Sequence, residues 1–371
     1  MKIISVVITD LVTDQRVHRS CLLMHNMGYD VKLIGRILPN SLPMPKRDYK
    51  CKRVRLPFTK GPAFYASFNI YLFFKLLFSS FDAVWANDLD TLLACRLVSK
   101  LRRKKLIFDS HEYFTEVPEL IDRPRVKNFW KRIERKIVPK LPFMITVNDS
   151  IANLFNQEYN IPVIAVRNIP LKIKDVNYKT RAELNLPEDK KILIIQGSGI
   201  NIHRGAEEAV FAMKNIENAI LLIIGGGDVF PKLKEIVKNE KLENKVFLLP
   251  KLKREELIHY TAAADIGLTL DKNASINHLY SLPNKIFDYI QAGIAVLGTN
   301  LPEIANIINK YNVGITIEKN EVDLLTETLN KMLSDEKNIL IWKKNSILAS
   351  EELCWENESK VLSTKIKEYV G

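Results

Sequence analysis

Short hydrophobic runs alternate with longer segments of helical spacing along almost the whole chain, and this alternation limits the possible folds more than any other feature. In the first half the runs predict strands at Lys2–Ile8, Asp30–Ile34, Ala83–Trp85, Leu106–Phe108 and Met144–Val147. After a proline-punctuated linker at about 168–188, they predict strands at Lys191–Gln196, Ala219–Ile224, Val246–Leu249, Ile266–Leu270, Ala295–Gly298 and Gly314–Ile317. Such alternation is typical of parallel sheets with helices on both faces. The sequence therefore predicts two doubly wound α/β domains, followed by a last helix at about 350–369 that no strand follows.

Composition agrees with a globular protein of two domains. The chain has 371 residues, of which 47% are apolar and 26% charged, and this balance excludes disordered and fibrous proteins. The first residues show no cleavage-site pattern, so we expect no secretory signal. The four cysteines form no C-x-x-C pair, which argues against a zinc site or a thioredoxin motif. We expect them to be reduced and mostly buried in a cytoplasmic protein.

The excess of positive over negative charge is confined to the first half of the chain. Residues 1–170 hold 28 Lys and Arg against 15 Asp and Glu, a net charge of +13, whereas the remainder has a net charge of −1. The basic clusters are Lys46–Lys60, Lys100–Lys105 and Arg123–Lys140. They indicate either an anionic membrane surface as a partner or ordinary solvated helix faces. We expect no nucleic-acid partner, because the clusters lack an interleaved aromatic motif.

The segment Phe64–Phe81 is unusually aromatic for a helix of a parallel α/β domain. It is about 18 residues long and carries a single charge, Lys75, which brings it close to the length of a membrane-spanning helix. Asn69, Lys75 and the serines argue against spanning. A core helix and a helix that lies on a membrane surface, with Lys75 reaching the interface, both remain open.

A helix after residue 282 carries the best-defined group of candidate binding residues. Pro283 suits a first helical turn and Gly293 a helix end, so free N–H groups near Pro283, Asn284 and Lys285 would face a phosphate. Asn284, Lys285 and Asp288 are spaced to lie near one helix face. A cation over phosphates and a carboxylate one turn later suit a nucleoside diphosphate, whose ribose the acid would hold. An ordinary capped helix with a surface ion pair is the alternative.

Two glycine-rich segments directly follow predicted strands. In the first, Gly197, Ser198 and Gly199 precede Arg204, whose guanidinium matches phosphate oxygens. In the second, Gly225 and Gly226 follow the next strand. The first segment is not G-x-G-x-x-G, which argues against nicotinamide-dinucleotide binding. Both segments are either phosphate-binding loops or simple turns.

Polar residues also follow strands in the first half of the chain. His111 and Glu112 come directly after one predicted strand, at the edge where parallel sheets bind ligands. The residue at position 115 is Thr, so His111 belongs to no H-E-x-x-H zinc motif. The remaining candidates there are acceptor-side residues: Asp14, Arg16, Asp88 and Asp90. For Asp14 a helix cap is the alternative, and for His111 a structural role.

Taken together, the motifs resemble the retaining glycosyltransferases of family 4. The resemblance rests on D-Q-R-V-H-R at 14–19, D-S-H-E at 109–112, N-I-P at 168–170, Arg204-Gly205, G-G-G at 225–227, A-D-I-G-L at 264–268, the 282–293 helix and Trp355-Glu356. They stand in the family's order over nearly the whole chain. The resemblance implies a GT-B fold, in which two Rossmann-like domains face a cleft. We expect an acceptor-side domain at 1–168, a nucleotide-sugar domain at 169–349, and a terminal helix at 350–371 that packs back on the first domain.

The resemblance also implies roles for single residues. Asp288 matches the family's ribose-binding acid, Arg204 its diphosphate-binding lysine, and His111 a histidine that contacts the donor sugar. The first of the family's two acids is replaced by Tyr280, and an arginine by Ser198. Lys285 restores the lost phosphate charge, as in relatives that carry a P-x-K helix.

The function expected from the sequence is sugar transfer from a nucleoside-diphosphate sugar to a glycan or lipid-linked acceptor, for a cell-surface polysaccharide or glycolipid. His111, Glu112, Arg204 and Lys285 are the expected catalytic residues, with no metal ligands and no cofactor beyond the donor. Arg204, Lys285 and backbone N–H groups would stabilise the leaving diphosphate. We expect a cytoplasmic protein that associates with the inner face of the plasma membrane. A nucleotide-sugar epimerase and a non-catalytic nucleotide-sugar-binding protein are the alternatives.

Overall fold

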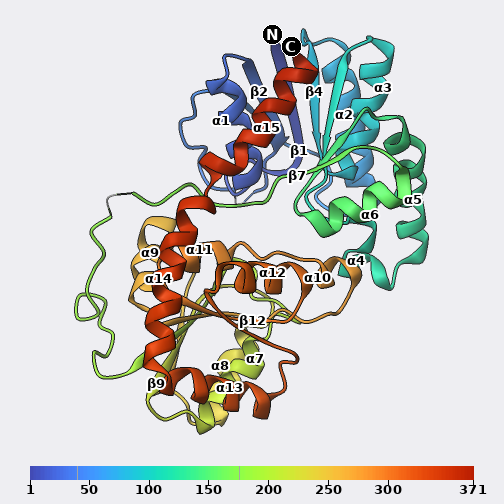
Figure 1. Cartoon of the computed structure of the whole chain (residues 1–371). Helices are drawn as coiled ribbons and strands as arrows, with labels where there is room; N and C mark the ends of the chain where they lie inside the picture. Colours follow the sequence, from blue (N-terminus) through green and yellow to red (C-terminus); the bar gives the residue numbers. More distant parts are fainter. Residues whose placement is uncertain (40, 175) are drawn as a thin grey trace. The chain divides into compact units, whose positions relative to one another are not determined.

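The computed structural model describes residues 1–39, 41–174 and 176–371, and within them the chain forms two compact units. The first unit comprises residues 1–168 and 358–371, and the second comprises residues 169–357. Each is built on one parallel sheet, with seven strands in the first and six in the second. The predicted fold class, two parallel α/β domains in series, is confirmed (Figure 1).

The sheet of the first unit has the order β3-β2-β1-β4-β5-β6-β7, with every pair of neighbours parallel. Its strands are β1 (Lys2–Asp10), β2 (Asp30–Arg36), β3 (Lys50–Val54), β4 (Ala83–Asn87), β5 (Lys105–Asp109), β6 (Met144–Thr146) and β7 (Val163–Ala165). Its helices are α1 (Gln15–Asn26), α2 (Gly61–Leu77), α3 (Leu89–Leu101), α4 (Pro118–Ile121), α5 (Pro124–Ile137) and α6 (Asp149–Tyr159). The central strands β1 and β4 are almost entirely buried, as expected for a sheet covered on both faces.

The sheet of the second unit has the order β10-β9-β8-β11-β12-β13. Its strands are β8 (Lys191–Gly197), β9 (Ala219–Gly225), β10 (Val246–Leu249), β11 (Ile266–Thr269), β12 (Ala295–Thr299) and β13 (Gly314–Ile317). Its helices are α7 (Ala206–Ala212), α8 (Phe230–Asn239), α9 (Arg254–Ala263), α10 (Ile276–Leu279), α11 (Lys285–Gln291), α12 (Pro302–Tyr311), α13 (Val322–Ser334) and α14 (Glu336–Glu352). Two hydrophobic clusters, one on each face of the sheet, form the core.

The predicted last helix is present, but it begins about five residues later than the sequence suggested. Helix α14 ends at Glu352, and a separate helix, α15 (Trp355–Val370), begins three residues later. The break is held in place by backbone contacts, because the Trp355 N–H donates to the Pro170 carbonyl (2.9 Å). Residues 358–371, the last part of α15, belong to the first unit (Figure 1). There Glu358 pairs with Arg167, and Tyr369 packs against Phe143.

Helix α2 accounts for most of the aromatic segment. Phe64, Phe68, Leu72 and Leu76 recur every fourth residue and are buried, whereas Phe74, on another face, is 55% exposed. The helix thus buries one stripe in the core, as predicted for a core helix. None of the described helices combines the length and the apolar character needed to cross a membrane. The four cysteines are free, and three of them are buried, as predicted.

Candidate functional site

In the second unit, the predicted donor-binding residues gather where the strands of the sheet end. Gly197 is the last residue of β8, and the loop that follows it carries Ser198, Gly199 and Arg204 before α7 begins. Gly225 is the last residue of β9. Because all six strands are parallel, their carboxyl ends lie at one edge of the sheet, where ligands of such folds bind.

The two glycine loops are packed directly against each other. The Ile200 N–H donates to the Gly226 carbonyl (2.7 Å), and the Gly226 N–H to the Gly197 carbonyl (3.3 Å). A Cβ on Gly225 would lie 1.8 Å from the Gly197 carbonyl oxygen. Only glycine at 225 therefore permits this close approach, so this residue shapes the loops whatever they bind. The Cα of Gly226, by contrast, has open space around it.

Arg204 and Lys285, the two predicted phosphate-binding cations, meet on one carboxylate. The Arg204 guanidinium donates to Asp271 Oδ1, and Lys285 Nζ lies 3.7 Å from Asp271 Oδ2. The Thr269 hydroxyl also donates to Oδ2 (3.2 Å). Residues that are 81 positions apart in the chain thus form one charged cluster at the edge of the sheet.

Helix α11, which carries Lys285, is anchored to the sheet by Tyr289. The ring of Tyr289 lies against Gly267 of β11, where a Cβ would come within 2.3 Å of it. Its hydroxyl lies 3.2 Å from the Ile194 carbonyl oxygen and 3.1 Å from that of Leu268. Burial raises the pKa of this phenol, which remains neutral. The tyrosine therefore fixes α11 relative to β8 and β11.

The donor-side helix begins later than the sequence suggested. Its first residue is Lys285, with Asn284 as the N-cap, so Pro283 precedes the helix instead of standing in its first turn. The predicted end is right, since Gly293 follows the C-cap with a φ of +70°. The helix has only seven residues. Its side chains are thus better candidates for phosphate binding than its N-terminus.

Asp288, the predicted ribose-binding acid, has polar neighbours of its own. Gln196 Nε2 donates to Asp288 Oδ2 (3.3 Å), and Arg254 lies 3.6 Å from Oδ1. Asp288, Gln196, Arg254 and the Thr261 side chain line a small hollow with a volume of about 20 Å³. The carboxylate therefore faces a partly polar recess and not bulk solvent alone.

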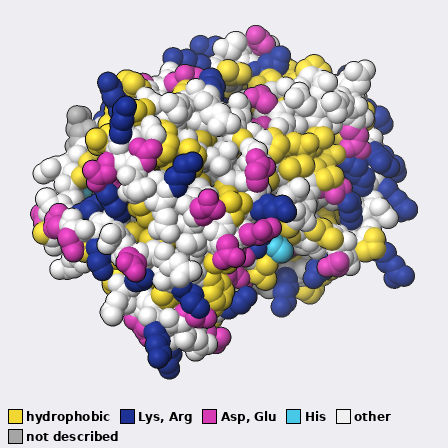
Figure 2. All heavy atoms as spheres, turned by 60° about the horizontal axis from the view of Figure 1, so that its bottom comes forward, with side chains coloured by type: hydrophobic (Ala, Val, Ile, Leu, Met, Phe, Trp, Pro, Cys, Tyr) yellow, Lys and Arg dark blue, Asp and Glu magenta, His cyan; other side chains and the backbone are white. Residues whose placement is uncertain are grey.

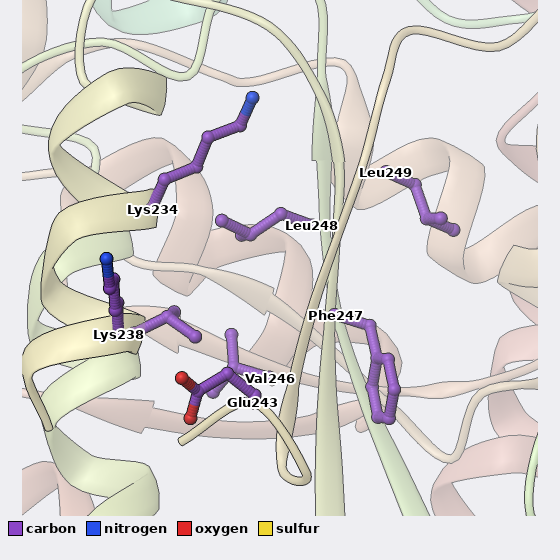
Figure 3. Close-up of a pocket in the computed structure, with 8 residues that line it drawn as sticks. Lys234, Lys238, Glu243, Val246, Phe247, Leu248 and Leu249 are labelled. Atoms are coloured by element: carbon purple, nitrogen blue, oxygen red, sulfur yellow. The ribbon is translucent and has the colours of Figure 1, made fainter. Parts of the chain in front are cut away.

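A larger hollow of about 280 Å³ lies elsewhere in this unit, between α8 and the edge strand β10. Figure 3 shows Lys234 and Lys238 on the helix and Leu248 directed toward them, with Phe247 turned to the other side of the strand. None of the predicted site residues lines this hollow. It is therefore separate from the candidate donor site.

In the first unit, His111 lies between two carboxylates just after β5. Its Nδ1 is 3.2 Å from Asp88 Oδ2, and its Nε2 is 3.6 Å from Asp109 Oδ2. Burial opposes the charged imidazole, but Asp88 and Asp109 outweigh burial and raise the pKa of His111 to about 9. At neutral pH His111 is therefore a cation. Asp88 has a φ of +62°, a strained conformation for a residue other than glycine.

All three guanidinium nitrogens of Arg16 donate hydrogen bonds within this unit. Its Nε and Nη2 donate to the two oxygens of Asp109 (3.2 and 2.7 Å), and its Nη1 donates to the Val166 carbonyl (2.6 Å). Burial alone would raise the pKa of Asp109, but Arg16 and His111 hold it well below its usual range. Arg16 thus joins α1 to the ends of β5 and β7.

The other predicted acceptor-side residues have different environments. Asp14 caps α1 by accepting from the Val17 N–H (3.1 Å), and its second oxygen accepts from Thr9 (2.8 Å), as in the helix-cap alternative. Asp90 is buried at the start of α3, and burial raises its pKa well above the usual value. Glu112 is half-buried beside His111, and its carbonyl accepts from the Ser110 hydroxyl (2.8 Å).

Sequence reasoning missed Asp271, which holds the two cations. It lies two residues after β11, as other candidates lie after their strands, so its position alone was a usable signal. Across the described ranges, no group of three or more His, Cys, Asp and Glu side chains is arranged to hold a metal ion.

Two parallel-sheet α/β domains in series form the GT-B fold, which is also found in glycosyltransferases of solved structure. Residues 15–171 match the family described as glycosyltransferase family 4, and residues 177–348 match glycosyl transferases group 1. The chain thus carries one domain of each of these two glycosyltransferase families. No curated protein sequence matches the chain.

Solved structures of GT-B glycosyltransferases resemble the whole chain at low sequence identity. Sucrose-phosphate synthase from Thermosynechococcus elongatus matches with a TM-score of 0.78 and 16% identity, over 99% of this chain and 98% of that one. HepE from Anabaena, solved in complex with UDP-glucose, matches with a TM-score of 0.71 and 12% identity, over 98% and 100%. WaaG, a glycosyltransferase involved in lipopolysaccharide biosynthesis, matches with a TM-score of 0.69 and 16% identity, over 97% and 99%.

Proposed function

We propose that this protein transfers a sugar from a nucleoside-diphosphate sugar to a glycan or lipid-linked acceptor, with retention of configuration at the anomeric carbon. The observation that carries the proposal is the convergence of Arg204 and Lys285 at the edge of the second sheet. Paired cations of this kind stabilise the charge that grows on a leaving diphosphate. The UDP-glucose bound to HepE supports a donor of this class.

In the proposed reaction, Arg204 and Lys285 hold the diphosphate and Asp288 accepts hydrogen bonds from the ribose hydroxyls. Gly197, Ser198, Gly199 and Gly226 allow backbone approach. The bond between the sugar and the diphosphate breaks as the acceptor attacks the same face of the sugar. The leaving phosphate takes the proton of the acceptor, so that no protein nucleophile and no metal ion are needed. His111, with its charge held by two carboxylates, would bind the donor sugar.

Binding of the nucleotide is the first test. Thermal unfolding is measured with UDP, GDP, ADP, CMP and NAD(P) for the native protein and for Lys285→Ala and Asp288→Ala. A ligand at about 100 times its dissociation constant adds about 2.7 kcal/mol, which raises the midpoint by about 5–10 °C. We expect one nucleoside diphosphate to give this shift and both variants to lose most of it. Lys234→Ala, in the separate hollow, is the control and keeps the shift.

Transfer itself is tested with the matching nucleotide-sugar and a membrane extract as the acceptor source. The product is analysed by NMR for the anomeric configuration, which should be the same as in the donor. A shift with NAD(P) alone, or the inverted anomer, would contradict the proposal.

Tyr280 favours a second candidate, a nucleotide-sugar-binding protein without transferase activity. The resembled family has an acid at this position, and Tyr280 here follows α10 without supplying a carboxylate. This alternative predicts nucleotide binding with no transfer to any acceptor in the extract.

We further propose that the first unit associates with an anionic membrane, consistent with a membrane-linked acceptor. On α5, Arg125, Phe129, Arg132 and Lys136 are exposed and are spaced to share one face of the helix. The only acid of this helix, Glu134, is buried. Lys and Arg side chains gather at the right edge of Figure 2, the side on which Figure 1 draws α5. A basic helix face with an exposed aromatic suits a surface of anionic lipids.

Co-sedimentation with vesicles tests this association. Each basic side chain near such a surface contributes about 1 kcal/mol, so the double variant Arg132→Glu with Lys136→Glu should weaken binding to phosphatidylglycerol vesicles by more than about tenfold. The double variant Lys337→Glu with Lys344→Glu, at two exposed lysines of the second unit, is the charge-matched control and should bind normally. Equal binding to neutral phosphatidylcholine vesicles would contradict the electrostatic explanation.

A further inference from the structure

Asp271 occupies a position between the two candidate phosphate-binding cations that none of the sequence motifs explains. Its side chain is 1% exposed. One oxygen accepts from the Arg204 guanidinium, and the other lies 3.7 Å from Lys285 Nζ and accepts from the Thr269 hydroxyl. Each oxygen thus engages one cation, much as two oxygens of a diphosphate would.

The two cations need a counter-ion while no ligand is bound. Lys285 is 13% exposed. Burial lowers its pKa, Asp271 raises it, and the neighbouring Arg204 lowers it again. Burial would raise the pKa of Asp271, but Lys285 and Arg204 outweigh burial and keep the carboxylate ionised. Without a nearby anion, the positive charges of Arg204 and Lys285 would repel each other at a site with little access to water.

We infer that Asp271 is an internal counter-ion that holds Arg204 and Lys285 in the empty site and competes with the diphosphate of the donor for them. The inference rests on the proposed function, because it assumes that these cations bind a diphosphate. Arrival of the diphosphate replaces part of the contact with Asp271, and the carboxylate then repels the bound anion. After transfer, the same repulsion promotes release of the nucleoside diphosphate.

The chain offers a matched control at the other end of the same strand. Asp265 immediately precedes β11, and its side chain is 8% exposed. It also pairs with two cations, Arg181 (2.8 Å) and Lys343 (2.7 Å). Because Asp265 lies at the amino end of β11, away from the glycine loops, its removal should destabilise the fold without changing the binding of a diphosphate.

The test compares nucleotide binding to the native protein with binding to Asp271→Asn, Asp271→Ser and Asp265→Asn. Isothermal titration uses whichever of UDP, GDP and ADP binds the native protein, together with the matching nucleoside, which lacks phosphates. We expect both neutral variants at 271 to bind the diphosphate about tenfold more tightly, equivalent to about 1.4 kcal/mol. We expect unchanged binding of the nucleoside, and unchanged binding of the diphosphate by Asp265→Asn.

Thermal unfolding gives a second readout. Without ligand, Asp271→Asn should unfold at a lower temperature than the native protein, and the diphosphate should raise its midpoint by more than it raises the native one. Added salt should weaken binding more steeply in this variant, since the net charge of the site is larger. A purely structural role for Asp271 predicts lower stability with unchanged or weaker diphosphate binding.

The outcomes separate the two hypotheses. If no nucleoside diphosphate binds the native protein, the proposed function fails. If one binds the native protein but a folded neutral variant at 271 binds it no more tightly, the counter-ion inference is wrong and the proposed function stands. Tightening by Asp265→Asn as well would also overturn the inference, because it would show a general effect of charge.

Discussion

The raised pKa of the His111 imidazole predicts how the stability of the first unit depends on pH. In the folded protein Asp88 and Asp109 raise the pKa of His111 to about 9, against 6.5 for the free side chain. A group with a raised pKa in the folded state stabilises the protein fully below its unfolded pKa. This contribution is then lost as the pH rises from about 6.5 through 9.

The size of the effect follows from the shift. Each pKa unit corresponds to 1.36 kcal/mol, so the shift of His111 is worth on the order of 3 kcal/mol. The imidazole is only 17% exposed, which limits screening by solvent. For a domain of this size, 3 kcal/mol corresponds to roughly 6–12 °C in the unfolding midpoint.

Scanning calorimetry between pH 6 and pH 10 tests the prediction on the native protein and on His111→Gln. The variant should be less stable at pH 6, and the difference should shrink toward zero by pH 10. His25→Gln, in the last turn of α1, is the control and should leave the pH dependence of the native protein intact. A His111→Gln difference that stays constant across this range, or an NMR titration of His111 near pH 6.5, would refute the reasoning.

Three further substitutions test the packing of both units, each measured by thermal or denaturant unfolding. Gly205→Ala should cost at least about 2 kcal/mol and weaken diphosphate binding, because Gly205 has a φ of +73° and a Cβ there would lie 2.4 Å from Leu270; native-like stability would contradict this. Tyr289→Phe should keep the fold but cost about 1–2 kcal/mol, since it removes the buried hydroxyl that bonds to the sheet backbone. Arg16→Met should cost about 3–5 kcal/mol, because Asp109 is then left buried without its main partner; a loss below about 1 kcal/mol would show that Asp109 takes up a proton easily.

Strands were predictable where both faces of the sheet are covered. All six strands of the second unit appear as predicted from their hydrophobic runs, with ends shifted by at most one residue. Strands β3 and β7, which form the two edges of the first sheet, were not predicted. Three of the five residues of β3 (K-C-K-R-V) are basic, and β7 has three residues, all half-buried. Strand β3 lacks a hydrophobic run and β7 is only three residues long, so periodicity does not reveal them, whereas the edge strands of the second sheet, β10 and β13, form apolar runs.

The sequence predicted which positions carry candidate site residues, but not which of these side chains pair with one another. Glycines and charged residues after a strand are visible in the sequence, because the carboxyl ends of parallel strands meet at one edge. The pairing of Arg204 with Asp271 spans 67 residues, and their neighbours Gly205 and Leu270 also pack closely, since a Cβ on Gly205 would lie 2.4 Å from Leu270. The alternative roles at Asp14 illustrate the same limit, since cap and ligand-binding residues share one sequence pattern.

The charged cluster around Arg16 and the charged cluster of Arg204 and Lys285 differ in how readily their side chains can contact a ligand. In the first unit, all three guanidinium nitrogens of Arg16 donate to protein oxygens, and its side chain is 6% exposed. A ligand could recruit Arg16 only by breaking buried contacts. In the second unit, the Arg204 side chain is 29% exposed, and Lys285 is held only at 3.7 Å from Asp271. An incoming diphosphate can therefore gain contacts there at little structural cost. This difference supports a structural role for Arg16 and the proposed diphosphate binding by Arg204 and Lys285, although both clusters present the same chemistry in the sequence.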